Sequence, residues 1–506
     1  MKSSTVLRTQ ALVSAMAVGL GGSAAAAEAD TLQDRKAQIE APQKKVPELE
    51  QKQQTAEHKQ AAAAPDKVVT GGNTKGGFPF VADDGSLTFH GITLYGALDI
   101  GVAYQTHGTP LSNSAGLGLE YLIQKNSNHS QFSVAPNAMT TSNIGLKGTE
   151  EVIPGVSVIF KLETAFLPTS GRLADGLGSL VQNNGVPIGS QTSNADSSKN
   201  GQAFNNTAWV GVSSPTLGAL TFGRQNSLTL DGVLAYDPMG GSGAFSVIGY
   251  QGTTAGTGDT EDARLDNSLK YRVNHGPVRA AALYKFGASG SSAYEAGVGV
   301  DYLGASFDAI YSHVNDAVSA APLASLAAIT PAQLASAGSG LVAGTVSDNT
   351  SFMLLAKYGM GPVQLFAGYE HIQFANPGHP LAVGSQLPNS GGGYSLGSVN
   401  NTAFTNKKVF QIFWAGAKYA VRSDIDLIAA YYHEQQNSFQ GKGCSDNSFA
   451  SCSGQLDAVS VVADYRFAKR FDVYAGAMFS RVSNGLANGF LHTSTIDPTV
   501  GLRFTF

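Results

Sequence analysis

The sequence predicts an all-β protein, a 16-stranded antiparallel transmembrane β-barrel that follows a short helical arm. Three observations support this fold class. Apolar and polar residues alternate with a period of two from residue 89 to the end of the chain, and tight and long connections alternate between the resulting strands. Only 14% of the 506 residues are charged, against about 25% in typical soluble domains. No segment is apolar over the 18 or more residues that indicate a membrane-spanning helix.

The first 27 residues have the three parts of a secretory signal peptide. Lys2 and Arg8 are basic, Ala11–Leu20 is apolar, and Ala25–Ala27 supplies small residues for cleavage. An uncleaved membrane anchor is the alternative, but the apolar part is half the length of roughly 20 residues that a spanning helix needs. We therefore expect residues 1–27 to be a signal peptide and the protein to be exported.

Residues 28–77 have a different composition from the rest of the chain, rich in Gln, Lys, Glu and Ala. Leu32, Ile39 and Val46 recur every seven residues, as in one seam of a coiled coil. Pro42 and Pro47 interrupt that seam, because proline removes a helical hydrogen bond. We expect a polar, partly helical periplasmic arm that ends in a Gly-rich linker. A solvated tail and an oligomerising stalk both fit this pattern.

Residues 78–506 are expected to form the barrel. In Ile92–Val102 the aliphatic side chains keep one parity, while Thr93, Tyr95 and Asp99 occupy the other. Lipid cannot hydrogen-bond the backbone, so strands of this kind must close into a barrel. The sixteen predicted strands cover 89–104, 141–149, 155–166, 204–213, 218–226, 265–273, 277–286, 293–302, 305–314, 349–358, 362–373, 408–419, 424–435, 456–466, 471–482 and 495–506.

The connections alternate in length in the way expected of a membrane barrel. Those after even-numbered strands are tight, and most of those after odd-numbered strands are long and polar: 105–140, 167–203, 227–264, 315–348, 374–407 and 436–455. Outer-membrane barrels have short turns at one end and long loops at the other, whereas a soluble sandwich has no reason to sort its loops. A helix beginning near Pro331 is suggested within the fourth long connection.

Four runs resemble the Gram-negative trimeric general porins: SNIGLKGTEEVIPGVSVIFKLETAF (142–166), NTAWVGVSSPTLGALTFGRQ (206–225), DNSLKYRV (266–273) and VGLRFTF (500–506). The resemblance implies a bacterial outer-membrane diffusion channel, usually a homotrimer, whose partners are ions, small hydrophilic solutes and outer-membrane lipid. A substrate-preferring porin and a structural or adhesive outer-membrane protein with long surface loops are the alternatives.

Side chains of the polar parity are expected to face the lumen, because a Lys or Arg facing lipid at mid-membrane costs about 2–4 kcal/mol. The expected inward residues are Tyr95, Asp99, Asn143, Lys147, Lys161, Glu163, Asp266, Lys270, Arg272, Arg279, Lys285, Lys357, Asp464, Arg466 and Arg503. For each of them a solvated wall position without contact to solute is the alternative.

The resemblance also implies that the third long connection folds back into the barrel and narrows it. Its expected acidic side comprises Asp231, Asp237, Asp259 and Glu261, and the opposing basic side comprises Lys147, Lys161, Arg224, Arg264 and Lys270. Opposed charges across a pore orient dipolar solutes and set ion preference. Arg224 shares the parity of Leu220 and Phe222, so either a bulge turns it inward or it lies beyond the lipid.

Aromatic residues near predicted strand ends fit either interfacial girdles or packing within the barrel: Tyr104, Phe166, Trp209, Phe222, Phe374, Trp414, Tyr431, Tyr432 and Phe479. The two cysteines, Cys444 and Cys452, are eight positions apart in a polar segment, and an oxidising compartment favours a disulfide between them. A metal site would need further ligands, and none are clustered there, so we expect no cofactor.

Catalysis and nucleic-acid binding are both disfavoured. The ten histidines are scattered, and no His-Glu-x-x-His, Gly-x-Ser-x-Gly or Walker sequence occurs, so we expect no enzyme. The formal net charge is −5, whereas proteins that bind a phosphate backbone carry an excess of Lys and Arg.

Overall fold

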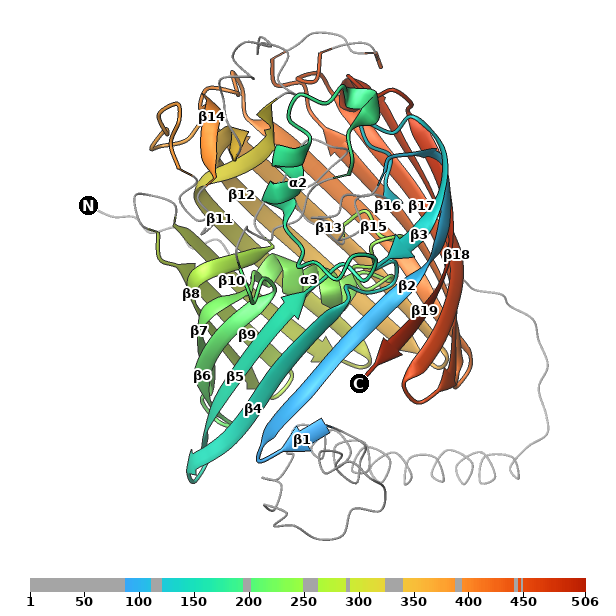
Figure 1. Ribbon diagram of the computed structural model, residues 1–506. Coiled ribbons are helices and arrows are strands. Elements are labelled where there is room, and N and C mark those ends of the chain that lie inside the picture. The colour runs from blue at the N-terminus through green and yellow to red at the C-terminus, as the bar shows by residue number, and fades with distance from the viewer. Residues whose placement is uncertain are drawn as a thin grey trace, which may run out of the picture. The chain divides into compact units, whose positions relative to one another are not determined.

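The computed structural model describes residues 87–110, 121–193, 202–248, 263–287, 292–323, 340–386, 394–440, 445–446 and 449–506. The expected signal peptide and the arm lie outside these residues. The described strands form a single 19-stranded sheet that closes on itself (Figure 1). None of the helices in these described segments is long and apolar enough to cross a membrane.

Sixteen of the 19 strands form the wall, and each pairs antiparallel with its neighbours, which confirms the predicted barrel. They are β2 (Ile92–Gly108), β4 (Asn143–Ile153), β5 (Val156–Ala165), β6 (Thr207–Ser214), β7 (Gly218–Asn226), β8 (Arg264–His275), β9 (Val278–Lys285), β10 (Ala293–Tyr302), β11 (Ala305–Pro322), β12 (Leu341–Met360), β13 (Val363–Ala375), β15 (Lys408–Arg422), β16 (Ile425–Gln436), β17 (Gly454–Ala468), β18 (Phe471–Asn484) and β19 (Ser494–Thr505).

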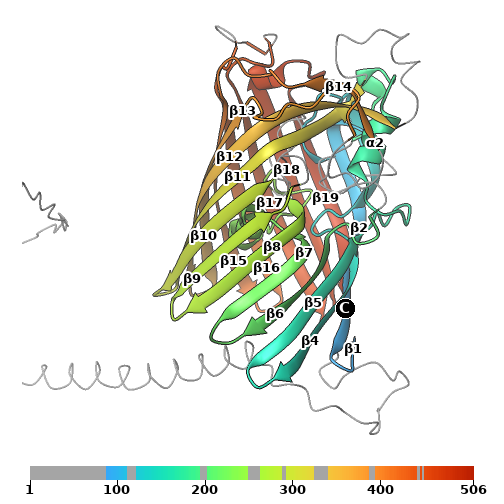
Figure 2. The ribbon, with the colours of Figure 1, turned by 90° about the vertical axis from the view of Figure 1, so that its left-hand side faces the viewer.

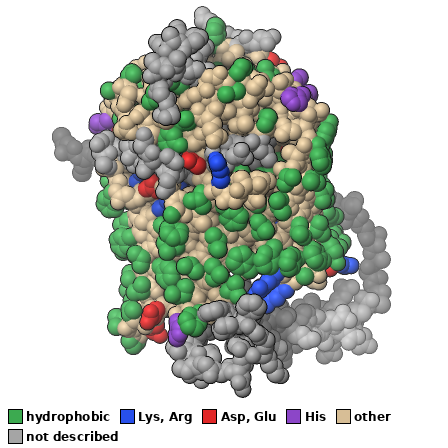
Figure 3. Space-filling model, in the orientation of Figure 1, with side chains coloured by type: hydrophobic (Ala, Val, Ile, Leu, Met, Phe, Trp, Pro, Cys, Tyr) green, Lys and Arg blue, Asp and Glu red, His purple; other side chains and the backbone are tan. Residues whose placement is uncertain are grey.

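The last strand closes the barrel against the first wall strand. The β19–β2 ladder runs from Thr499 opposite Ala103 to Thr505 opposite Ala97. The amide of Phe506 then donates to the carbonyl of Gly96 at 3.1 Å. Along each strand the side chains alternate between the two faces, and the outer face is covered with apolar groups (Figure 3). Closure gives each of the sixteen wall strands a partner on both sides, as a bilayer requires.

Tight turns gather at one end of the barrel and long connections at the other (Figure 1). Between β10 and β11, Leu303 and Gly304 have φ values of 48° and 80°. Two successive residues of positive φ make the compact turn that matches the twist of a hairpin. The alternation predicted from the connection lengths is therefore a physical separation of the two ends.

The predicted connection 315–348 is partly strand, because β11 continues to Pro322 and β12 begins at Leu341. The extension has its own small core, formed by the buried side chains of Leu180, Val342 and Leu396. Leu180 belongs to α2 (Gly176–Gln182) and Leu396 to β14 (Ser395–Asn400), which pairs parallel with β12. β11 and β12 therefore extend beyond the other wall strands, because α2 and β14 cover the apolar side chains of the extension. The suggested helix near Pro331 lies outside the described residues.

A further strand lies within the predicted connection 105–140. β3 (His129–Pro136) pairs with the upper half of β2, and β4 pairs with its lower half, so the two share one position in the wall. Asp99 of β2 stabilises the connection between β3 and β4. Its carboxylate accepts hydrogen bonds from the amides of Met139 (2.8 Å) and Thr140 (2.6 Å). The remaining short elements are β1 (Leu87–Phe89), η2 (Ile188–Ser190), α3 (Leu228–Tyr236) and η4 (Gly485–Ala487).

Candidate functional site

The third loop (residues 227–263) enters the barrel as the helix α3 (Figure 1). Ser227 caps this helix, its hydroxyl accepting from the amide of Leu230 at 3.0 Å. Glu295 of β10 accepts from the amide of Leu228, which ties the helix start to the wall. A Cβ at Gly232 would lie only 2.8–2.9 Å from the side chains of two wall residues, Leu355 and Ile310. The absence of a side chain at Gly232 therefore permits α3 to pack directly on β11 and β12.

The next part of the third loop is anchored to the wall formed by β15–β18. Asp237 accepts a hydrogen bond from the hydroxyl of Tyr432 at 2.6 Å and is itself buried. Burial raises the pKa of the Asp237 carboxyl, and the hydrogen bond from Tyr432 opposes that shift. The indole of Trp414 donates to the carbonyl of Tyr236 at 3.1 Å. Further along, the ring of Phe245 packs edge-on against Tyr474. These contacts fix the loop across the lumen.

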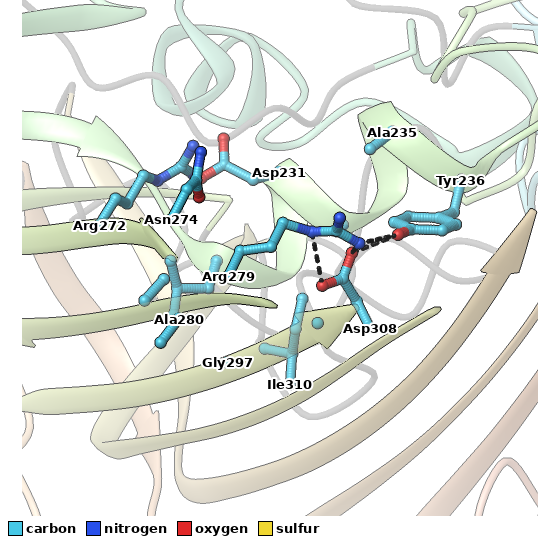
Figure 4. Close-up of a pocket in the computed structure, with 14 residues that line it drawn as sticks. Asp231, Ala235, Tyr236, Arg272, Asn274, Arg279, Ala280, Gly297, Asp308 and Ile310 are labelled. Carbon is cyan, nitrogen blue, oxygen red and sulfur yellow. Dashed lines mark hydrogen bonds and ion pairs between the residues drawn. The ribbon is translucent and has the colours of Figure 1, made fainter. Parts of the chain in front are cut away.

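On the other side, charged residues of β8–β11 meet α3 in two groups (Figure 4). In the first, Asp231 of the helix accepts from Lys270 at 2.6 Å and also pairs with Arg272. Each of these bases lies on β8 with its side chain toward the helix. Acid and bases are in direct contact and do not face each other across open water, and the single carboxylate of Asp231 neutralises one of the two positive charges.

The second group surrounds Tyr236 at the end of α3. Its hydroxyl donates to Asp308, which pairs with Arg279 at 3.0 Å (Figure 4). Arg279 also pairs with Asp301. The ammonium of Lys357 lies 5.0 Å from the centre of the Tyr236 ring, a cation–π distance. Arg279 is therefore fixed by two carboxylates and remains partly exposed to the lumen.

A cavity of about 210 Å³ lies between α3 and part of the β8–β11 wall, beside the places where the helix contacts that wall (Figure 4). Its floor is apolar, formed by residues such as Ala280, Gly297 and Ile310. Members of the two charged groups also line it: Asp231, Arg272, Tyr236, Arg279 and Asp308.

A third charged group lies on β2, β4 and β5. The ammonium groups of Lys147 and Lys161 lie 5.3 Å and 5.5 Å from the ring centre of Tyr95. Lys161 also pairs with Glu163 at 3.1 Å, and Tyr95 donates to the same carboxylate at 2.8 Å. These two lysines were predicted together for the basic side, and the structure brings them together.

Arg224 has the ladder position expected from its parity, but its side chain is buried. It pairs across the ladder with Ala208, next to the exposed Phe222. The ladder does contain a bulge, but the extra residue lies in β8, where it brings Asp266 to 2.6 Å from Arg224. Its guanidinium also donates to the carbonyl of Asn205. The charge of Arg224 is thus neutralised near the end of β7, where Asp266 is its partner.

The remaining predicted residues fall in different places. Arg264 begins β8 opposite Asn226, and Asp237 anchors the loop to an aromatic wall through Tyr432. Asp259 and Glu261 lie outside the described residues. Cys452 is disulfide-bonded, and the other cysteine in the sequence, Cys444, also lies outside the described residues.

Sequence reasoning did not single out Tyr236, Glu295, Asp301 or Asp308. The strand pattern could have identified Asp308. It lies between Phe307 and Ala309 and has the same inward parity as Ile310. For Tyr236 no local signal exists, since its role depends on where α3 crosses the lumen.

The model of a family described as Gram-negative porin matches residues 60–485. An outer membrane porin protein of Bordetella pertussis is 25% identical over 182 residues, which are 36% of this chain and 39% of that protein. The match therefore spans less than half the length of this curated relative.

Two solved structures have a similar fold. The anion-selective porin from Comamonas acidovorans superposes with a TM-score of 0.52 at 16% identity, covering 82% of this chain and 99% of that one. In vitro folded OmpT, an outer membrane protein of Vibrio cholerae, gives 0.50 at 14% identity, covering 83% and 99%. At these identities the likeness concerns the barrel architecture.

Proposed function

The chain belongs to the Gram-negative porin family, and on that premise we propose that it is a passive diffusion channel. It resides in the outer membrane, where ions and small hydrophilic solutes pass down their gradients. The closed barrel with α3 fixed inside it carries this proposal. A closed sheet satisfies the backbone in lipid, and the charged groups around α3 supply polar contacts for hydrated solutes.

In this proposal the third loop narrows the channel. Its described part lies between the charged β8–β11 wall and the aromatic β15–β18 wall, bonded to both. Lys147, Lys161, Arg272, Arg279 and Lys357 are the basic groups we assign to the solute path. Asp231 and Asp308 are the acidic ones.

The decisive experiment is planar-bilayer recording of the full-length protein in asymmetric salt. We expect stepwise conductance increases, and a reversal potential that gives the ion preference. Detergent without protein, and heat-unfolded protein, are the controls. Folded protein that inserts into the bilayer but never conducts would overturn the proposal.

We further propose that three copies associate through the side of the barrel where the wall strands are shortest, which we call the low wall. β6, β7 and β9 have 8, 9 and 8 residues, whereas β12 has 20 (Figure 2). The outer face of this low wall exposes apolar side chains, including Val210, Val212 and Phe222. Cross-linking in native membranes should give a trimer, and Val210→Arg should reduce it to monomers. Monomers in the unmodified protein would contradict the assignment.

We attribute no catalysis to the chain. A purified sample that released acyl chains from phospholipid, and lost this activity on a single Ser or His substitution, would overturn that view.

A further inference from the structure

The cavity between α3 and the β8–β11 wall combines an apolar body with a polar end. Small and aliphatic residues form the body: Leu228, Ala235, Ala281, Gly297 and Ile310. Arg272 and Asn274 of β8 form the polar end, and because they are two positions apart they lie on the same face of the strand (Figure 4). Sites for small organic molecules have this composition, mostly apolar with a few polar groups that fix the orientation of the ligand.

Both residues of the polar end have hydrogen-bond donors to spare. A guanidinium carries five N–H donors, and within the described part of the chain that of Arg272 contacts Asp231 alone. The Asn274 side chain is exposed and makes no hydrogen bond to any residue that the structure describes. The Arg272 side chain is 49% exposed, so a solute in the lumen can reach it.

The charges around the cavity differ between its two ends. Beside Arg272 a single carboxylate, that of Asp231, is shared by two bases. At the other end Arg279 contacts two carboxylates, those of Asp301 and Asp308. One negative charge on a solute is therefore favoured beside Arg272, whereas a second one at the far end would face Asp308. The arrangement suits a solute with one anionic group.

The size of the cavity limits the rest of that solute. A cavity of about 150 Å³ can hold a benzene molecule, and this one measures about 210 Å³. We propose that it binds a small monocarboxylate whose apolar body is about the size of a benzene ring. The carboxylate accepts from the Arg272 guanidinium and the Asn274 amide, and the ring lies against Gly297 and Ile310. The inference rests on the proposed function and names a solute class for the constriction.

Gly297 offers a way to reduce the cavity without removing a charge. A Cβ at this position would lie 3.5 Å from the side chain of Ile310 and 3.7 Å from that of Leu228, which are ordinary van der Waals distances. Alanine therefore fits here, and its methyl group occupies space that the ring needs. Arg272→Gln tests the polar end separately, because it removes the charge and leaves Asp231 paired with Lys270.

The test is single-channel recording of the full-length protein with benzoate, which has both parts of the proposed solute. We expect benzoate to reduce the current in a saturable way, because a bound ring narrows the lumen beside α3. Acetate lacks the ring and benzyl alcohol lacks the charge, so each should have little effect at the same concentration. An equal effect of either compound would overturn the assignment of the site.

Two variants should weaken the effect of benzoate. Arg272→Gln should raise the half-effect concentration about tenfold or more, as expected for loss of a charge-assisted hydrogen bond. Gly297→Ala should raise it about fivefold or more, as expected when a methyl group enters a filled site. Lys418→Gln is the matched control. It also removes one positive charge, but Lys418 pairs with Asp426 on β15 and does not line the cavity, so the half-effect concentration should not change.

A loss of the benzoate effect in Lys418→Gln as large as that in Arg272→Gln would indicate a general effect of charge and overturn the inference. An unmodified channel that conducts but does not respond to benzoate would also overturn it, and the channel function would stand. A protein that never conducts would overturn the channel function itself. Stepwise insertion into the bilayer shows that each variant has folded.

Discussion

The two sides of the lumen that hold the third loop differ in chemistry. The β8–β11 wall presents Lys270, Arg272 and Arg279, which pair with acids of α3 and of the wall itself. The β15–β18 wall presents Trp414 and Tyr432, both buried by the same loop. One side is therefore an exchangeable polar surface and the other is a packed core. Barrel interiors need not be uniformly polar, since a loop that crosses the lumen creates an interior of its own.

This comparison separates the roles of the two sides. Contacts of the aromatic wall are buried, so they should govern stability and the position of the loop. Contacts of the charged wall are partly exposed, so they should govern which ions pass. Changes on the aromatic side are therefore expected to have the larger energetic effects.

The largest effect is expected for Trp414→Ala. Truncating a buried tryptophan removes about 3–5 kcal/mol from the free energy of unfolding, and here it also removes the hydrogen bond to Tyr236. Denaturant titration of the protein in lipid vesicles measures the loss. Phe413→Ala is the control, because Phe413 is exposed on the outer face of the same strand. Equal losses in both variants would contradict the packed-core assignment.

A smaller loss is expected for Tyr432→Phe, which leaves the buried carboxylate of Asp237 without its side-chain donor. The amides of Met239 and Gly241 still donate to this carboxylate, so the loss is that of one hydrogen bond to a charged group, about 1.5–3 kcal/mol. The same titration measures it, and current noise should rise as the loop loosens. The neighbouring Tyr431 donates to Asp457 from an exposed position, so Tyr431→Phe should change stability by under about 0.5 kcal/mol. Equal losses of stability in Tyr432→Phe and Tyr431→Phe would contradict the assignment of Tyr432 to a packed core.

On the charged side, Arg279→Gln should alter ion preference more than stability. It leaves Asp301 and Asp308 without their guanidinium partner, so the lumen gains negative potential and cations are favoured. One unit charge at contact distance in water is worth about 1 kcal/mol, or roughly a fivefold change in relative permeability. Reversal potentials in a salt gradient measure this change. Arg422→Gln, at the exposed end of β15, should have no effect.

The smallest effect is expected for Lys147→Ala. This exposed ammonium lies over Tyr95, and such a contact contributes about 0.5–1 kcal/mol. Its removal should shift the reversal potential in the same direction as Arg279→Gln, but less. A shift as large as that of Arg279→Gln would place the narrowest point at β4 and β5 rather than beside α3.

The local sequence was informative wherever one face of a strand meets lipid. The alternation in Ile92–Val102 and in the closing run 500–506 predicted strands that the structure contains, and connection lengths predicted which end carries the loops. It was uninformative wherever loop elements cover the wall. Trp414 and Tyr432 fitted either a girdle or internal packing, and the third loop decides for the inside. β3, β14 and α2 were missed because each is stabilised by distant partners.

The sequence by itself determined the closed barrel, since lipid imposes a strict period of two and requires every backbone group to be paired. The tertiary structure decided which inward residues meet. It paired Asp231 with Lys270 and buried Asp237 against Tyr432. Parity tells which face of the strand each side chain occupies. The path of the third loop through the lumen depends on contacts such as Tyr236 with Trp414 and Asp237 with Tyr432, which join residues 178 and 195 positions apart. No local pattern encodes those contacts.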